Sequence, residues 1–107
     1  NVYWDAGNNG GSYNRVTKKS NDPSEYKGAW NHWVFTKNAN AGTLKIYLNG
    51  SLWASASGKT LDMSGIDSVT LGAVDDSGFQ RYNGKVDQLR VYDVELTADD
   101  ITALYNE

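Results

Sequence analysis

The sequence contains no cysteine, a single histidine and a single proline. Without cysteine the chain can form neither disulfide bonds nor thiolate metal sites. The one histidine, His32, excludes a metal centre that needs several imidazole ligands. Because His32 stands between Trp30 and Trp33, we expect it to pack within a strand rather than to act in catalysis.

Long apolar runs and clusters of basic side chains are missing as well. No apolar run approaches the ~20 residues of a membrane-spanning helix, so we expect no membrane insertion. The sequence has 10 Lys and Arg residues and 13 Asp and Glu residues, which gives a net charge of -3. Lys18-Lys19 is the one pair of adjacent basic residues. Since affinity for phosphates needs clustered cations, we expect no nucleic-acid partner.

The composition favours one all-β domain. A chain of 107 residues has room for a single core. Its 11 glycines and 12% aromatic residues are typical of short strands joined by tight turns. We expect one domain over residues 1–107. Because the chain opens at Asn1 and runs at once into an apolar stretch, we expect that domain to be part of a longer polypeptide.

Alternating apolar and polar residues predict the strands. The clearest alternation lies on both sides of Asn49-Gly50, a dipeptide typical of a type I′ hairpin turn. With Ser51 it also forms a glycosylation acceptor, although the turn alone explains both residues. Strands are predicted at residues 2–6, 13–18, 30–37, 44–48, 52–56, 69–73, 79–82 and 85–92. Residues 20–28 predict a polar loop, and a capping-box pattern from Thr97 to Asp100 predicts a short C-terminal helix.

Four motifs in one order, at residues 30–36, 42–50, 71–72 and 82–92, resemble a known family, and Leu96-Thr97 and Leu104-Tyr105 follow them. They are similar to the laminin-G-like domain of the concanavalin-A-like lectin/glucanase superfamily. The resemblance implies an antiparallel β-sandwich, a jelly roll, that meets ligands on its concave face or at a loop edge beside a calcium ion. It also implies an extracellular or surface-associated protein, virion structures included.

The resemblance is weak over residues 1–19. Members of the family usually supply several strands before the position of Val2, so the chain resembles an N-terminally short member. Missing strands leave unpaired backbone edges and an uncovered apolar face. We therefore expect either a homo-oligomer or a smaller, rearranged sandwich.

Asp87 is the candidate metal ligand. The period of two along residues 85–92 places its carboxylate in the row of Leu89 and Val91, which is expected to face the core. A buried carboxylate needs a partner. The resemblance suggests a structural Ca2+, and hydrogen bonds to a neighbouring loop are the alternative. Asp75 and Asp76 could ligate calcium, bind sugar hydroxyls or simply form a turn.

Aromatic side chains are the candidate sugar platform. Tyr47 and Trp53 lie opposite the apolar rows of the predicted hairpin, so we expect them to share one face. That face could bind sugar, pack against the second sheet or form an oligomer interface. The candidate ligand-binding residues are Asn8, Asn9, Tyr47, Trp53, Asp75, Asp76 and Tyr82.

Catalysis has little support in the sequence. Glucanases of this fold carry several carboxylates at alternate positions of one strand, and no strand predicted here has such a run. Nucleophile-elbow and phosphate-loop motifs are absent too. We predict a non-catalytic carbohydrate-binding or adhesion module whose partner is a glycan or polysaccharide. The alternatives are an assembly module that self-associates without sugar, and a remnant of a glycosidase that lost its catalytic strands.

Overall fold

The chain folds into two antiparallel sheets and one short helix. The computed structural model describes residues 1–9, 11–66, 68–73, 77 and 79–107. The first sheet pairs β1 (Val2–Asn9) with β2 (Ser12–Lys18), and the second runs β3 (Trp33–Asn38), β4 (Thr43–Leu48), β5 (Ser51–Ala56) in that order. A short 3-10 helix, η1 (Pro23–Glu25), connects the sheets, and α1 (Ala98–Tyr105) lies near the C-terminus.

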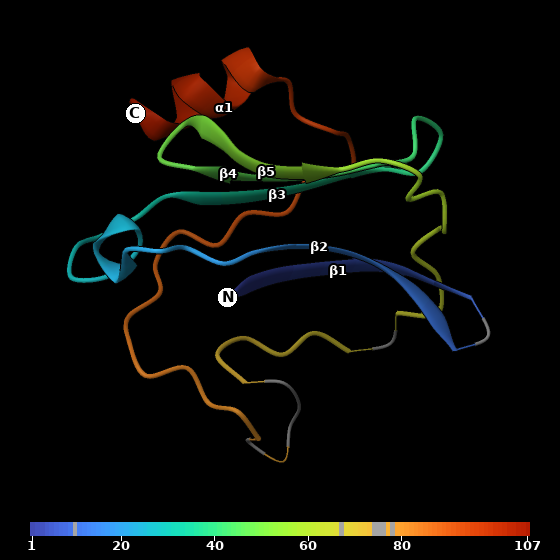
Figure 1. Cartoon of the computed structure of the whole chain (residues 1–107), viewed down its shortest axis with the longest axis horizontal. Helices are drawn as coiled ribbons and strands as arrows, with labels where there is room; N and C mark the ends of the chain where they lie inside the picture. The colour runs from blue at the N-terminus through green and yellow to red at the C-terminus, as the bar shows by residue number, and fades with distance from the viewer. Residues whose placement is uncertain (10, 67, 74–76, 78) are drawn as a thin grey trace.

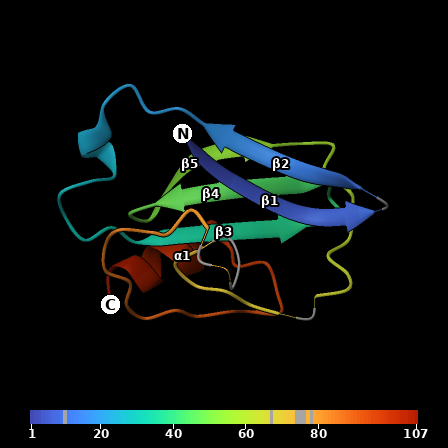
Figure 2. The ribbon, with the colours of Figure 1, turned by 90° about the horizontal axis from the view of Figure 1, so that it is seen from below.

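The two sheets form two layers. Figure 1 shows the β1–β2 hairpin under the three-stranded sheet, with α1 on the opposite face of that sheet. Figure 2 shows the hairpin stacked over the sheet of β3, β4 and β5. The strands of the two layers run in roughly similar directions. This architecture confirms the predicted all-β, sandwich-type fold with a short C-terminal helix.

The core lies between the layers. Ala6 and Val16 from the hairpin meet Leu44 and Ile46 from β4, and the latter two are fully buried. Burial of a leucine or isoleucine side chain such as Leu44 or Ile46 contributes about 1.5–3 kcal/mol to the stability of the fold. The indole Nε1 of Trp4 donates to the backbone oxygen of Thr36 at 3.0 Å, so a hydrogen bond also joins the two sheets.

The predicted hairpin around Asn49-Gly50 is confirmed. Both residues have positive φ, 51° and 82°, as a type I′ turn requires. The side chain of Asn49 is fully engaged: its Oδ1 accepts from the backbone N–H of His32 at 2.9 Å, and its Nδ2 donates to Asn31. The turn therefore also fixes the chain that leads into β3.

The capping box of α1 is confirmed as well. The backbone N–H of Asp100 donates to Thr97 Oγ1 at 3.1 Å, and the backbone N–H of Thr97 donates to Asp100 Oδ2 at 2.9 Å. These bonds from Thr97, side chain first, lower the pKa of Asp100. Ile101 is fully buried, and Thr102 Oγ1 donates to the backbone oxygen of Gly50, which anchors the helix to the hairpin turn.

The strands predicted at residues 69–73, 79–82 and 85–92 are wrong. No strand occurs between β5 and α1 among the described residues, and Val69 and Val91 are 84% and 88% exposed. The apolar alternation is present, but a strand also needs a neighbour that satisfies its N–H and C=O groups. Within the described part of the chain, both sheets are built from strands of residues 2–56 alone. None of the described helices has the length and apolarity to cross a bilayer.

Candidate functional site

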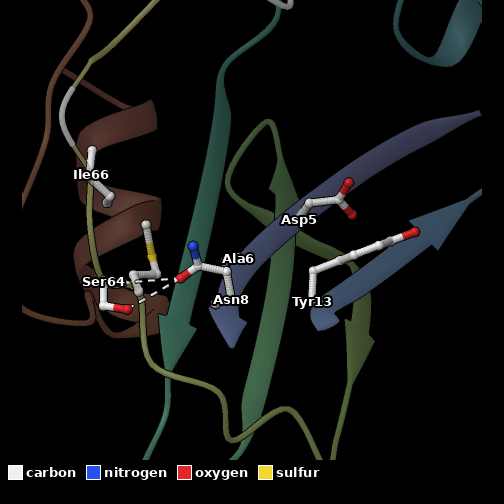
Figure 3. A pocket seen from close by; sticks show the side chains of 8 residues that line it. Asp5, Ala6, Asn8, Tyr13, Ser64 and Ile66 are labelled. Carbon is white, nitrogen blue, oxygen red and sulfur yellow. Dashed lines mark hydrogen bonds between the residues drawn. The ribbon is translucent and has the colours of Figure 1, made fainter. Parts of the chain in front are cut away.

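A pocket of about 260 Å³ lies at the end of the β1–β2 hairpin, where the hairpin meets the segment after β5. Figure 3 shows it between Asp5 and Tyr13 on the hairpin side and Ser64 and Ile66 on the other. The lining residues are Asp5, Ala6, Gly7, Asn8, Tyr13, Met63, Ser64 and Ile66. The lining residues thus include a tyrosine and apolar residues as well as an aspartate, an asparagine and a serine.

A β-bulge at Gly7 shapes this end of the hairpin. The register of β1 against β2 shifts between Ala6 and Asn8, and Gly7 has a φ of 85°. A Cβ at Gly7 would lie 2.2 Å from the backbone oxygen of Leu61, so only glycine allows this approach. The bulge lets the backbone N–H of Asn8 donate to the backbone oxygen of Asp62 at 3.1 Å. Bulges commonly redirect a side chain in this way.

Asn8 reaches across the pocket. Its Oδ1 accepts from both the backbone N–H and the hydroxyl of Ser64, each at 3.4 Å (Figure 3). Its Nδ2 has no hydrogen-bond partner among the residues that the structure describes. The amide therefore presents a donor to whatever enters the pocket.

The aromatic wall is held by a charged pair. Arg15 binds Asp5 with two hydrogen bonds of 2.6 Å, and its guanidinium lies over the rings of Tyr3 and Tyr13, 4.8 and 4.9 Å from their centroids. The hydrogen bond that Arg15 donates to the Asp5 carboxylate raises the pKa of Arg15. Because the two charges compensate each other, the pocket presents a polar but nearly neutral edge.

The opposite wall is tied to both sheets. Asn14 Oδ1 in β2 accepts from the backbone N–H of Leu61 and from Lys37 Nζ in β3, both at 2.9 Å. Lys37 Nζ also donates to the backbone oxygen of Lys59. Burial lowers the pKa of Lys37. This network fixes residues 59–61, and through them the start of the pocket's far wall.

Of the predicted ligand-binding residues that the structure describes, only Asn8 lines this pocket. Asn9 ends β1 opposite Ser12, and Asp75 and Asp76 lie outside the described residues. Tyr82 is 61% exposed and belongs to the irregular region between β5 and α1. The structure therefore does not gather these residues into one site.

Tyr47 and Trp53 do not share a face, so that prediction is wrong. A register shift between Ile46 and Tyr47 leaves Trp53 without a cross-strand partner and reverses the alternation of β5. Trp53 packs edge-on against Trp33 at 5.4 Å, with Lys18 Nζ 4.4 Å over its ring, beside the core. Tyr47, 5% exposed, points to the other face, where it pairs with Val34 and Leu52.

Asp87 does not face the core. It is exposed, and its Oδ1 accepts from the backbone N–H of the next residue, Gln88, at 2.8 Å. This bond goes to the adjacent residue and not to a neighbouring loop, which was the alternative to calcium. Across the part of the chain that the structure describes, no group of three or more His, Asp or Glu residues could hold a metal. Calcium at Asp87 stays a prediction.

Asp5 and Ser64 were not recognised from the sequence. The pairing of Asp5 with Arg15 follows from the hairpin register, so a charged cross-strand pair was available as a signal. Ser64 carries no such signal, because its place beside Asn8 depends on the bulge at Gly7 and on contacts far apart in the chain.

Comparison with known proteins points to one superfamily. The family model described as the concanavalin A-like lectin/glucanases superfamily, a laminin-G type, matches residues 1–102. No curated protein matches. A crystal structure of an S-layer domain-containing protein from Clostridium thermocellum has 24% sequence identity and a TM-score of 0.52. The match covers 87% of this chain and 45% of that one, so this chain spans less than half its length, and the likeness shows the fold alone.

Proposed function

Because the chain belongs to the concanavalin A-like lectin/glucanase superfamily, we propose that it is a non-catalytic module that binds carbohydrate outside the cell or on a cell or virion surface. The observation that carries the proposal is the pocket at the hairpin end, which is lined by Tyr13 together with the polar residues Asp5, Asn8 and Ser64. In this role the module neither inserts into a membrane nor binds nucleic acid.

The chemistry of the pocket suits a sugar ring. A pyranose has an apolar C–H face and a rim of hydroxyls, so it needs an apolar surface and a few hydrogen-bonding groups around it. Tyr13 and Met63 supply the apolar surface, Asn8 Nδ2 supplies a donor, and the Asp5 carboxylate supplies acceptors. The volume of about 260 Å³ fits one sugar residue rather than a length of polysaccharide.

A binding role fits the pocket better than glycoside hydrolysis. Hydrolysis normally needs two carboxyl groups that flank the scissile bond. Within the described residues, Asp5 is the one carboxylate that lines the pocket, and both of its oxygens accept from Arg15. A carboxylate held in this way binds hydroxyls but is poorly placed to transfer protons.

The first test compares two tyrosines. Tyr3 and Tyr13 are similarly exposed and both stack on Arg15, but only Tyr13 lines the pocket. After a glycan array identifies a ligand, we expect Tyr13→Ala to weaken binding in titration calorimetry by roughly tenfold or more, and Tyr3→Ala to leave it within about twofold. Equal losses in both variants, or an array without a ligand, would contradict the proposal.

The second candidate function is an assembly module without sugar binding. Its support is the row of exposed apolar side chains between β5 and α1, which includes Leu89, Val91 and Val94. The structural neighbour is an S-layer domain-containing protein, which agrees with such a role on a cell surface. Calcium would belong to either candidate as a structural ion, and its effect is measured by repeating the titrations with and without EDTA.

A further inference from the structure

Residues 85–94 have the pattern of a strand but make no strand pairing. Val86, Leu89, Val91 and Val94 are between 51% and 88% exposed. Among the residues that the structure describes, no strand forms backbone hydrogen bonds of a β-sheet with residues 85–94. An apolar, β-branched segment that leaves its backbone unpaired in water is suited to add to another strand.

Gln88, in the middle of the segment, has a strained backbone. Its φ is 53°, a left-handed conformation that is unfavourable for a residue with a Cβ. The backbone N–H of Gln88 bonds to Asp87 Oδ1, the side chain directly before it. An extended conformation would relieve the strain and release this N–H for a partner strand.

The sequence of the segment is complementary to itself in one antiparallel register. With Leu89 of one copy opposite Leu89 of the other, Lys85 lies opposite Asp93 at both ends, and Val86 lies opposite Tyr92. Opposite charges lie opposite one another twice, apolar residues meet at the centre and again three positions from it, and no like charges lie directly opposite. Gln88 lies opposite Arg90 and Asp87 opposite Val91. Direct cross-strand pairs of this kind are the units that stabilise a sheet.

Neighbouring registers lack this complementarity. Centring the pairing on Asp87 or on Arg90 would place that charge opposite its own copy, and centring it on Val91 would place Asp87 opposite Glu95. Like charges directly opposite one another are unfavourable. Centring it on Gln88 pairs no charges at all. The Leu89 register is therefore favoured over the four registers nearest to it.

We propose that residues 85–93 of two copies of this chain pair as antiparallel strands around a two-fold axis at Leu89. The interface is isologous, as in most homodimers, so each favourable pair occurs twice. It joins the chains through the backbone of a segment that forms no strand in the single chain. The sugar pocket at the hairpin end shares no residue with it, so the two proposals stand separately.

Charge reversal tests the register. We expect the purified chain to sediment as a dimer at equilibrium. Lys85→Glu and Asp93→Lys should each weaken association by roughly tenfold or more, because each places like charges opposite twice. The double variant K85E/D93K restores opposite charges and should recover the wild-type association.

The controls separate pairing from net charge and from folding. Lys19→Glu makes the same charge change at an exposed lysine outside the segment and should leave the dimer intact. Circular dichroism of every variant checks that it is folded. A wild-type chain that is monomeric at all concentrations would overturn the proposal. So would a dimer that all variants preserve equally, or a double variant no stronger than the singles.

Discussion

At the scale of single residues, Gly7 does most to create the candidate site. Its bulge brings β1 against the backbone of residues 61–62 and turns Asn8 towards Ser64. The apolar and polar wall of the pocket therefore depends on a position that has no side chain.

Gly7 and Gly11 form a matched pair for testing this role. Both have positive φ, 85° and 94°, but a Cβ at Gly11 meets no atom within 4 Å, whereas one at Gly7 meets the Leu61 oxygen. We expect Gly11→Ala to lower the free energy of unfolding by about 1 kcal/mol from backbone strain alone. Gly7→Ala should lower it by roughly 2 kcal/mol more, because the backbone must shift. Urea unfolding of the two variants measures the difference, and equal losses would mean that the close approach to Leu61 carries no cost.

At the scale of elements, α1 is held at its start by the reciprocal bonds of Thr97 and Asp100, and they make the helix sensitive to acid. The pKa of Asp100 lies below its ordinary value of 3.8 because Thr97 donates to the carboxylate. A lowered carboxyl pKa stabilises the fold fully above the ordinary value, and the contribution is lost as the pH falls through the folded pKa.

We therefore expect the stability of the wild type to fall more steeply than that of Asp100→Asn as the pH drops from about 5 to about 2. Asn keeps an acceptor for the Thr97 N–H but does not titrate. Asp99→Asn, in the same helical turn, is the matched control. Urea unfolding across the pH range checks this, and parallel curves for the wild type and Asp100→Asn would contradict it.

Elements with local signals were predictable from the sequence. The Asn49-Gly50 turn and the capping box at Thr97 depend on residues close together in the chain, and both are present. The face on which Trp53 lies was predicted wrongly, because a one-residue bulge moves the side chains that follow it to the opposite face of the sheet. The alternation of apolar and polar residues does not reveal such a bulge. Residues 85–92 were misassigned because a strand depends on its partner as much as on its own sequence.

The candidate site was predicted less well than the fold. Asn8 was identified because polar residues near a glycine-rich turn are natural ligand contacts. The rest of the pocket depends on residues 61–66 packing against the hairpin, and such non-local contacts have no periodic signature. Asp87 shows the same limit, since its expected burial required a strand that the single chain does not form.

At the scale of the whole molecule, the structure divides into a well-packed part and a loosely packed part. The core residues Ala6, Val16, Leu44 and Ile46 lie in the two sheets, whereas most side chains of residues 79–94 are exposed. Local opening costs little free energy where few contacts and few backbone hydrogen bonds must break.

We expect hydrogen exchange to follow this division. In the dissociated chain, amides of β4 should exchange slowly because β4 is the central strand of its sheet, and amides of residues 79–94 should exchange quickly. Mass spectrometry of the charge-reversal variants under dissociating conditions measures both. Protection of residues 79–94 equal to that of β4 would show that this segment is ordered without a partner.

The strand order of the two sheets also bears on how the chain folds. Each strand that the structure describes pairs only with its neighbour in sequence, β1 with β2 and β4 with β3 and β5. Such pairings close short loops, and proteins rich in local contacts fold faster than those with distant pairings. Both sheets can therefore form from residues 1–56 before the rest of the domain has folded. We expect α1 to dock last, when its Tyr105 reaches the hairpin turn at Gly50.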